Sequence, residues 1–293
     1  MYELIQAGEK SWYIKSPANV GVYRMNDEEV CLIDSGNDKD AGRKILKIIT
    51  ERGWRVSCIV NTHSNADHTG GNQFIQGRTG CRVISTDVEN AVSRHPMLEP
   101  TMLYGGYPYA KLRNKFLMAK PTEKTCNVED ELPAGLSVIK LPGHYFDMIG
   151  IMTDDGVCFL ADSIFRREII EKYHIVFIYD VAKFLETLDM IETLEAKLFV
   201  PAHADAAEDV RELAAANRAK VLEIAELLVG LCREPKTFEK ILKAVFDHYA
   251  LTMDDNQHVL VGSTIKSYLS YLYDNGRVTA EFIDNEMLWS AAQ

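Results

Sequence analysis

The most constraining feature of the sequence is the polar segment that follows an apolar strand expected at residues 56–62. This segment, THSNADHTGG, places two imidazoles and a carboxylate, those of His63, Asp67 and His68, within six residues. The strand fixes one end of the segment, and a pair of glycines at the other end begins a helix. Side chains held in this way can converge on one metal ion. The segment therefore predicts a metal site at the end of this strand.

Three further candidate ligands each stand at the end of another predicted strand. They are His144 in LPGH, Asp162 in FLADS and His203 in VPAH. Strand ends at one edge of a sheet can meet in space although they are far apart in the sequence. One metal site therefore accounts for all of these residues together.

The surrounding pattern interleaves strands and helices. The first third predicts the short strands YELIQ, SWYIK, NVGVYRM and EVCLIDS, and then a helix over residues 38–53 with Ile45, Ile48 and Ile49 on one face. Residues 136–162 predict the strands SVIKL, IGIMT and VCFLAD, and a helix and the strand KLFVPAH follow. This order predicts an α/β fold in which sheets are sandwiched between helices.

Between these two stretches, residues 89–131 are expected to be irregular. Long irregular segments in compact domains often act as lids or binding loops, but packing of an ordinary insertion on the core explains the segment equally well. Tyr104, Tyr107 and Tyr109 in this segment could line a pocket above the metal, because tyrosine offers an apolar face and a hydroxyl group. Packing against the core is the alternative for them.

A shift in composition divides the chain into a metal-binding domain, residues 1–207, and a C-terminal module, residues 208–293. The module predicts three helices and then two short strands, GRVTAEF and NEMLWS, which resembles a winged-helix arrangement. It holds 9 Lys and Arg against 14 Asp and Glu, and the helix that would enter a DNA groove offers only Lys266 as a cation. DNA recognition needs basic and hydrogen-bonding side chains on that helix. We therefore expect this module to have a structural role or to form a homodimer rather than to bind DNA.

Composition limits the partners and the location of the protein. The 293 residues carry a net charge of −11, which disfavours nucleic acid as a partner. The chain has no apolar run of membrane-spanning length and its start lacks a secretory pattern, so no membrane partner and a cytoplasmic location are expected. The six cysteines form no C-x-x-C pair, which predicts buried, reduced thiols.

The order H-x-x-x-D-H-x-G-G, PGH, AD-S-x-F and PAH resembles the metallo-β-lactamase superfamily over about residues 2–205. The resemblance implies an αββα sandwich with one or two divalent metal ions at the edge between the sheets. Zinc is usual in this family, and iron or manganese also occurs. The chemistry that the resemblance implies is hydrolysis or, in one branch, reduction of oxygen or nitric oxide.

The same resemblance implies roles for individual residues. Asp34, in LIDSG, matches an aspartate that supports the site from outside the ligand set. His174 and Tyr179 fall where the family often has substrate contacts, although a buried aromatic pair is an equal alternative. The implied ligands are His63 and His144 for the first metal, Asp67, His68 and His203 for the second, and Asp162 as the bridge between the two.

One position departs from the family pattern, which is H-x-H-x-D-H. Asn65 replaces the second histidine, and an amide oxygen is a weaker zinc ligand than an imidazole. We expect the first metal position to be the looser one, with a single metal preferring the second position. The amide NH2 of Asn65 could instead donate to the substrate or to the nucleophile. The oxygen-reducing branch has a glutamate here and carries a flavin domain for which this chain lacks room.

These features predict a metal-dependent hydrolase in which a metal-activated water attacks a small ester, thioester or lactone. Asp67 is suited to orient that water and to accept its proton, because a ligating carboxylate has a second oxygen free. Two alternatives stay open. One is a phosphodiesterase or nuclease, and the other is a non-catalytic metal-binding or partner-binding protein with a degenerate first metal site.

Overall fold

The computed structural model describes residues 2–292 and contains a seven-stranded sheet whose strands follow one another in chain order. Val60 pairs with Ile33 on one side and with Ile84 on the other, both in parallel. The segments that follow these three residues therefore start at the same edge of the sheet. The strands of this first sheet are β1 (Glu3–Gln6), β2 (Ser11–Lys15), β3 (Val20–Arg24), β4 (Glu29–Ile33), β5 (Arg55–Val60), β6 (Arg82–Ser85) and β7 (Thr125–Asn127).

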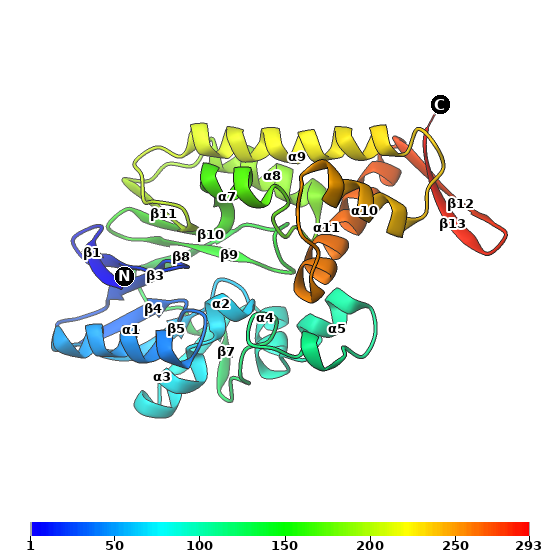
Figure 1. Cartoon of the computed structure of the whole chain (residues 1–293). Helices are drawn as coiled ribbons and strands as arrows, with labels where there is room; N and C mark the ends of the chain where they lie inside the picture. Colours follow the sequence, from blue (N-terminus) through cyan, green and yellow to red (C-terminus); the bar gives the residue numbers. More distant parts are fainter. Residues whose placement is uncertain (1, 293) are drawn as a thin grey trace.

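A second sheet of four strands faces the first (Figure 1). Its order is β11 (Leu198–His203), β10 (Val157–Phe165), β9 (Ile149–Thr153) and β8 (Leu136–Lys140). The strands β10 and β11 are parallel, and Phe165 pairs with His203. Asp162 and His203 thus lie near one end of two adjacent strands.

Apolar side chains from both sheets form the core between them. Ile33 and Val60 of the first sheet pack with Ile151, Phe159 and Val200 of the second. The residues next to them in sequence point the other way and are buried under helices. Burial on both faces explains why these strands appear as continuous apolar runs.

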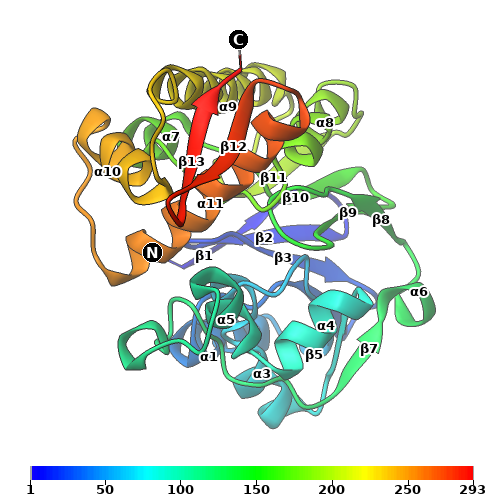
Figure 2. The ribbon, with the colours of Figure 1, turned by 90° about the vertical axis from the view of Figure 1, so that its right-hand side faces the viewer.

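Helices cover the outer face of each sheet, so the molecule has the expected αββα layers (Figure 2). The helix α1 (Lys39–Glu51) begins at Asp38, whose side chain accepts from the Ala41 N–H, and it buries Ile45 and Ile49 on the first sheet. The other covering helices are α3 (Asn72–Thr79) on the first sheet and α7 (Arg167–Tyr173), α8 (Val181–Ile191) and α9 (Arg211–Leu231) on the second.

The expectation of an irregular segment over residues 89–131 is wrong for much of its length. Short helices and an edge strand fill it, and they were missed because elements of one or two turns show no clear periodicity. Strand β7 pairs with β6 in parallel, with Cys126 opposite Ile84. The other elements are α4 (Asp87–Arg94), α5 (Leu98–Tyr104), the 3-10 helix η1 (Ala110–Leu112) and α6 (Val128–Glu131).

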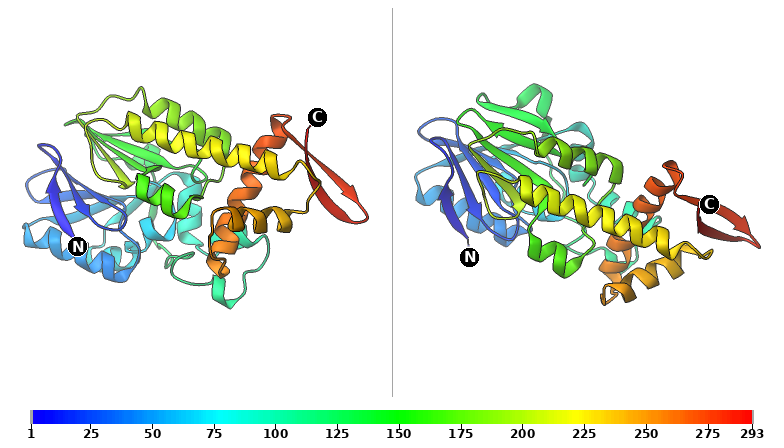
Figure 3. Two further views of the ribbon diagram at one scale, coloured as in Figure 1. Left: turned by 45° about the horizontal axis from the view of Figure 1, so that its top comes forward. Right: turned by 90° about the horizontal axis from the view of Figure 1, so that it is seen from above.

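The C-terminal part contains the three helices and the hairpin expected from its sequence. Helix α9 runs along the outside of the second sheet and ends beside the remaining elements (Figure 3). Leu228 of α9 belongs to one continuous apolar cluster with Ile164 of β10 and with Ile265 and Leu269 of the C-terminal part. The remaining elements are α10 (Phe238–His248), α11 (Asp255–Asp274), β12 (Val278–Ile283) and β13 (Glu286–Ala291).

The start of α11 packs against residues 102–117, which lie between β6 and β7 in the sequence. Leu112 and Leu117 share an apolar cluster with Val259. The Tyr109 hydroxyl donates to Asp255 over 2.6 Å. None of the helices between residues 2 and 292 combines the length and apolarity that crossing a bilayer requires. All six cysteines are free thiols, as expected.

Candidate metal centre

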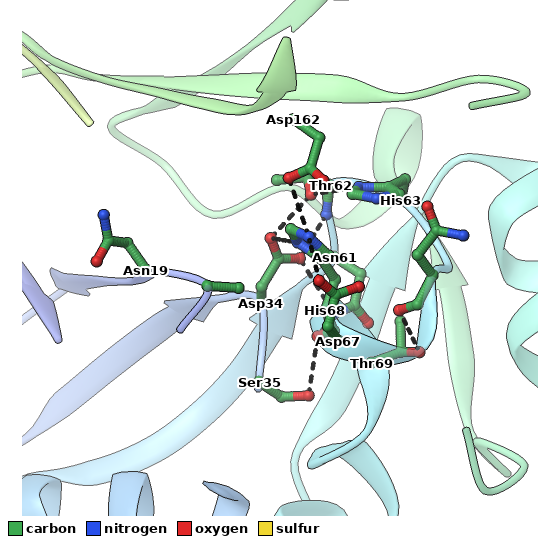
Figure 4. A network of polar contacts seen from close by, with 12 residues as sticks. Asn19, Asp34, Ser35, Asn61, Thr62, His63, Asp67, His68, Thr69 and Asp162 are labelled. Atoms are coloured by element: carbon green, nitrogen blue, oxygen red, sulfur yellow. Dashed lines mark hydrogen bonds and ion pairs between the residues drawn. The ribbon is translucent and has the colours of Figure 1, made fainter. Parts of the chain in front are cut away.

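Asp34 directly follows β4 and organises the loop that follows β5. Its Oδ2 lies 2.8 Å from His68 Nδ1 and accepts from the Thr62 hydroxyl over 2.8 Å, and its Oδ1 accepts from the Thr62 N–H (Figure 4). The Thr62 hydroxyl lies 3.1 Å from His63 Nδ1. Asp34 therefore orients His68 directly and His63 through Thr62, which agrees with the supporting role expected for it.

The glycine pair brings the short helix α2 (Ala66–Thr69), and His68 with it, close to Asp34. The main chain at Ser35 donates to the His68 carbonyl over 2.8 Å. A Cβ atom added at Gly71 would lie 2.2 Å from the Ser35 carbonyl oxygen. Only glycine permits this approach, which explains why the polar segment ends in a glycine pair.

The other two histidines, which come from the second sheet and its β8–β9 turn, are oriented in the same way. His144 Nδ1 lies 2.9 Å from the Phe177 carbonyl, and His203 Nδ1 lies 3.1 Å from the Pro17 carbonyl. In all four histidines an oxygen atom thus engages Nδ1, which leaves Nε2 free to face the centre. Metal-binding histidines typically show this arrangement.

The expected ligands form two groups that share Asp162. In each group the donor atoms lie within 4.8 Å of one another. The Nε2 atom of His63 is buried and has no hydrogen-bond partner among residues 2–292, whereas His68 Nε2 lies 3.0 Å from Asp162 Oδ1. A buried nitrogen without a partner is costly, and a metal ion satisfies it, so the residues fit a metal. The groups are Asp67, His68, Asp162 and His203, and His63, His144 and Asp162.

Electrostatics differ between the two groups. Burial lowers the pKa of His63 and of His144, which keeps both imidazoles neutral, as metal ligation requires. For His203 burial acts in the same direction, but the carboxylates of Asp162 and Asp67 outweigh it and raise the pKa to about 10. Asp162 Oδ2 lies 3.2 Å from His203 Nε2. This carboxylate-rich group attracts cations more strongly than the other one.

Asn65 stands between the first ligand group and a buried glutamate. Its NH2 group donates to Glu99 Oε1 over 2.8 Å, and its Oδ1 lies 3.2 Å from His144 Nε2. The proton of the neutral His144 ring lies on Nδ1, which donates to the Phe177 carbonyl, so His144 Nε2 carries a lone pair. His144 Nε2 and the Asn65 amide oxygen are therefore two acceptors that face each other. A cation between them satisfies both atoms. The amide NH2 group is engaged by Glu99 and is not free to donate to a substrate.

Two buried acids near the ligand groups, Glu99 and Glu89, were not predicted from the sequence. Glu89 Oε2 accepts from the Ser64 N–H over 2.9 Å and from its hydroxyl over 2.6 Å, while Oε1 accepts from the Asp147 N–H over 2.8 Å. It therefore ties the loop of His63 to the loop of His144. Burial raises the pKa of Glu89 to about 7 and that of Glu99 well above its usual value. Each is a single acidic residue on a short helix, and such a residue forms no recognisable sequence motif.

A cavity of about 450 Å³ opens onto the ligand groups. Its lining includes Asp67, Asp162 and His203, so a bound molecule can reach the candidate metal centre. The walls come from residues that the sequence analysis did not single out, among them Phe116 and Leu260. These residues meet only through tertiary packing, which left no signal in the sequence.

The aromatic residues expected at the pocket lie elsewhere. Tyr104 and Tyr107 are largely exposed and do not line the cavity, and neither does Tyr109, which bonds to α11. His174 stacks on Tyr249, with ring centroids 4.4 Å apart. Tyr179 packs against Phe146. The backbone at these positions turns their side chains toward the protein surface or other helices, and their neighbours face the cavity instead.

Comparison with known sequences supports the interpretation of the ligand pattern. The sequence model of the metallo-beta-lactamase superfamily matches residues 14–203, which include every expected ligand. A hydroxyacylglutathione hydrolase of Rhizobium etli is 30% identical over 122 residues, which cover 41% of this chain and 39% of that protein. One of Methylococcus capsulatus is 42% identical over 40 residues, or 14% and 16% of the two chains. The chain thus spans about two fifths or less of the curated relatives it matches.

Solved structures resemble nearly the whole chain. A metallo-beta-lactamase family protein from Thermus thermophilus superposes with a TM-score of 0.74 at 20% identity, covering 96% of this chain and 98% of that one. A beta-lactamase domain protein from Burkholderia ambifaria gives a TM-score of 0.75 at 20% identity, with 99% and 94% covered. At this identity the likeness concerns the fold, and it extends through the C-terminal helices.

Proposed function

Because the chain belongs to the metallo-beta-lactamase superfamily, we propose that it is a metal-dependent hydrolase that cleaves small thioesters. The observation that carries this proposal is the pair of ligand groups that share Asp162 at the floor of a cavity open to small molecules. The relatives named hydroxyacylglutathione hydrolase support a thioester over an ester or a lactone.

Two metal positions follow from the ligand groups. Asp67, His68 and His203 would hold one ion, with Asp162 shared between the two positions. His63, His144 and the Asn65 amide oxygen would hold the other, more weakly, because the amide carries no charge. Bound at these positions, a divalent ion such as zinc would polarise a carbonyl group and lower the pKa of water.

Asp67 is suited to manage the proton of the attacking water. Its side chain is 44% exposed and lines the cavity, and its Oδ2 lies 3.3 Å from His203 Nε2. The other carboxylate oxygen can accept a hydrogen bond from the water and then its proton. Water oxygen adds to the thioester carbonyl carbon as Asp67 takes a proton from the water, the carbon–sulfur bond breaks, and the leaving thiolate takes that proton from Asp67. Asp67 thus acts as the proton acceptor of the reaction.

The test combines metal content with hydrolysis. Plasma mass spectrometry of protein purified without added metal or chelator should find at least one divalent ion per chain. The same protein should hydrolyse members of a thioester panel, and Asp67→Ala should lose at least about 100-fold in kcat/KM. Asp27→Ala, which removes an exposed aspartate from a turn, is the matched control and should keep full activity. Metal bound without any hydrolysis would favour the non-catalytic alternative.

A further inference from the structure

The cavity over the candidate metal centre has predominantly apolar walls. Ile169 and Tyr173 come from α7, Val176 and Phe177 from the segment that follows it, and Leu260 from α11. Phe116, which is 68% exposed, forms part of the rim. An exposed apolar surface of this kind is usual where a ligand binds.

The wall after α7 is held in place from outside the cavity. His174 has a positive φ of 56°, which reverses the chain at the end of the helix. Its ring stacks on Tyr249, whose hydroxyl donates to Glu223 over 2.9 Å. Farther along, the Ile178 N–H donates to the Thr264 hydroxyl of α11 over 3.3 Å. The apolar side chains between these two anchors are therefore fixed toward the cavity.

The cavity offers little to a charged substrate. Among its lining residues within the described part of the chain, Lys115 is the single lysine or arginine. Its ammonium group lies 3.2 Å from the Asp38 carboxylate, so its charge is already compensated. The acidic residues of the lining belong to the metal centre or, in the case of Glu99, bond to Asn65. A substrate with several free carboxylates, such as a glutathione conjugate, finds only this one lysine, already in an ion pair, among the lining residues.

We infer that the cavity binds the apolar acyl group of a thioester, with the thioester carbonyl at the metal centre. This inference rests on the proposed function and specifies its substrate. A volume of about 450 Å³ accommodates an acyl chain of medium length together with part of the leaving group. The preferred substrate is thus an apolar acyl thioester rather than a 2-hydroxyacyl glutathione.

The first experiment measures kcat/KM for the acetyl, butanoyl, hexanoyl and octanoyl thioesters of N-acetylcysteamine, and for S-lactoylglutathione. Each buried methylene should raise kcat/KM by up to about fourfold, and the octanoyl thioester should exceed S-lactoylglutathione. Leu260→Asn, which places an amide in the wall, should lower the octanoyl-to-acetyl ratio about tenfold. Leu222→Asn makes the same change at an exposed site on α9 and should leave the ratio unaltered.

A second experiment measures binding without catalysis. Titration calorimetry of the metal-loaded protein with the S-octyl and S-ethyl thioethers of N-acetylcysteamine should show at least about tenfold tighter binding of the octyl compound. The octyl complex should also have the more negative heat-capacity change. Leu260→Asn should remove this preference.

The two experiments distinguish failure of the acyl-group assignment from failure of the proposed hydrolase function. Hydrolysis that is independent of chain length, or that favours S-lactoylglutathione, would overturn the acyl-group assignment and leave the hydrolase in place. Preferential binding of the octyl thioether with no hydrolysis of any thioester would overturn the hydrolase and keep the apolar pocket. Equal binding of both thioethers would refute the pocket, whatever the activity.

Discussion

Asn65 shows how one residue can set the balance between two metal positions. Its amide oxygen meets His144 Nε2 at 3.2 Å, and its NH2 group is fixed by Glu99. In the proposed two-metal site the side chain would thus be a neutral ligand where an imidazole would bind more strongly. The position beside His63 should therefore be the first to lose its metal.

Asn65→His should raise the tightly bound metal from about one to about two ions per chain, because it adds an imidazole to the weaker group. Metal content after gel filtration, measured by plasma mass spectrometry, tests this. Asn61→His is unsuitable as a control because Asn61 bonds to Asp34, so Asn26→His in the exposed turn serves instead. Equal metal content in wild type and Asn65→His would contradict the assignment.

Glu89 gives the stability of the fold a dependence on pH. Burial raises its pKa from 4.5 to about 7. A carboxyl group with a raised folded-state pKa stabilises the fold fully only below its unfolded value, and this contribution is lost as the pH rises through the folded value. Wild type should therefore lose about 3 kcal/mol of stability between about pH 5 and pH 8 through this group.

Glu89→Gln keeps the shape of the side chain but cannot ionise. The free energy of unfolding of wild type should thus fall by about 3 kcal/mol relative to that of this variant as the pH rises across that range. Urea unfolding in the presence of chelator measures it without metal-linked protons. Parallel pH profiles for the two proteins would show that Glu89 keeps an ordinary pKa.

At the residue scale, the sequence contained enough to find the ligand candidates, and the structure brings their side chains together. They could be predicted because each follows an apolar strand and the strands end at shared edges. Glu89 and Glu99 could not be predicted, because a buried acid is recognisable only from the groups around it. For His174 the sequence left a substrate contact and an aromatic pair equally open; its ring stacks on Tyr249, and its neighbours Tyr173 and Ile175 line the cavity.

At the scale of elements, the turn between β8 and β9 depends on one glycine. Gly143 has φ of 120°, and its carbonyl accepts from the N–H groups of Tyr179 and Asp180. A Cβ atom at this position would lie 2.2 Å from the backbone nitrogen of Phe184 in α8. The start of α8 thus closes over the turn that carries His144.

Gly143→Ala should destabilise the protein by about 3 kcal/mol or more, from backbone strain and overpacking together. Gly53→Ala is the matched control, since φ at Gly53 is 77° but a Cβ atom there meets nothing within 4 Å. That change should cost only about 1 kcal/mol. Denaturant unfolding measures the free energy of unfolding of both variants. Similar decreases in the two would mean that α8 shifts to make room for the added methyl group.

The long helices agreed with their sequence patterns, and so did the short strands β1 to β4, whereas several other short elements were missed. Helices α1, α9 and α11 were predicted because their length allows an apolar face to repeat. Helices α5 and α7 and strand β7 were missed, since their sequences are too short to show a period. The missed elements matter for function, because α7 forms part of the cavity wall.

At the scale of the whole molecule, the candidate metal centre joins the two sheets. His63, Asp67 and His68 follow β5 of the first sheet, whereas Asp162 and His203 belong to the second. A bound ion is therefore a link between the two halves of the sandwich. Its removal should weaken the contact between them.

Chelation should lower the melting temperature by about 5 °C or more, because an ion that binds only the folded chain stabilises it by about 3 kcal/mol at 100 times its Kd. Circular dichroism with and without EDTA measures the shift. Asp162→Ala lacks the shared carboxylate and should show little change on chelation. An unchanged melting temperature in wild type would argue against an ion that links the sheets.

Besides Phe165 of β10, the apolar walls of the cavity come largely from parts of the chain that contribute no candidate metal ligand. They are the region around Phe116, the turn after α7 and the start of α11. Substrate scope and reaction chemistry are therefore encoded in separate stretches of the gene. A mutant library restricted to these stretches can explore new substrates while every member keeps the same reactive centre.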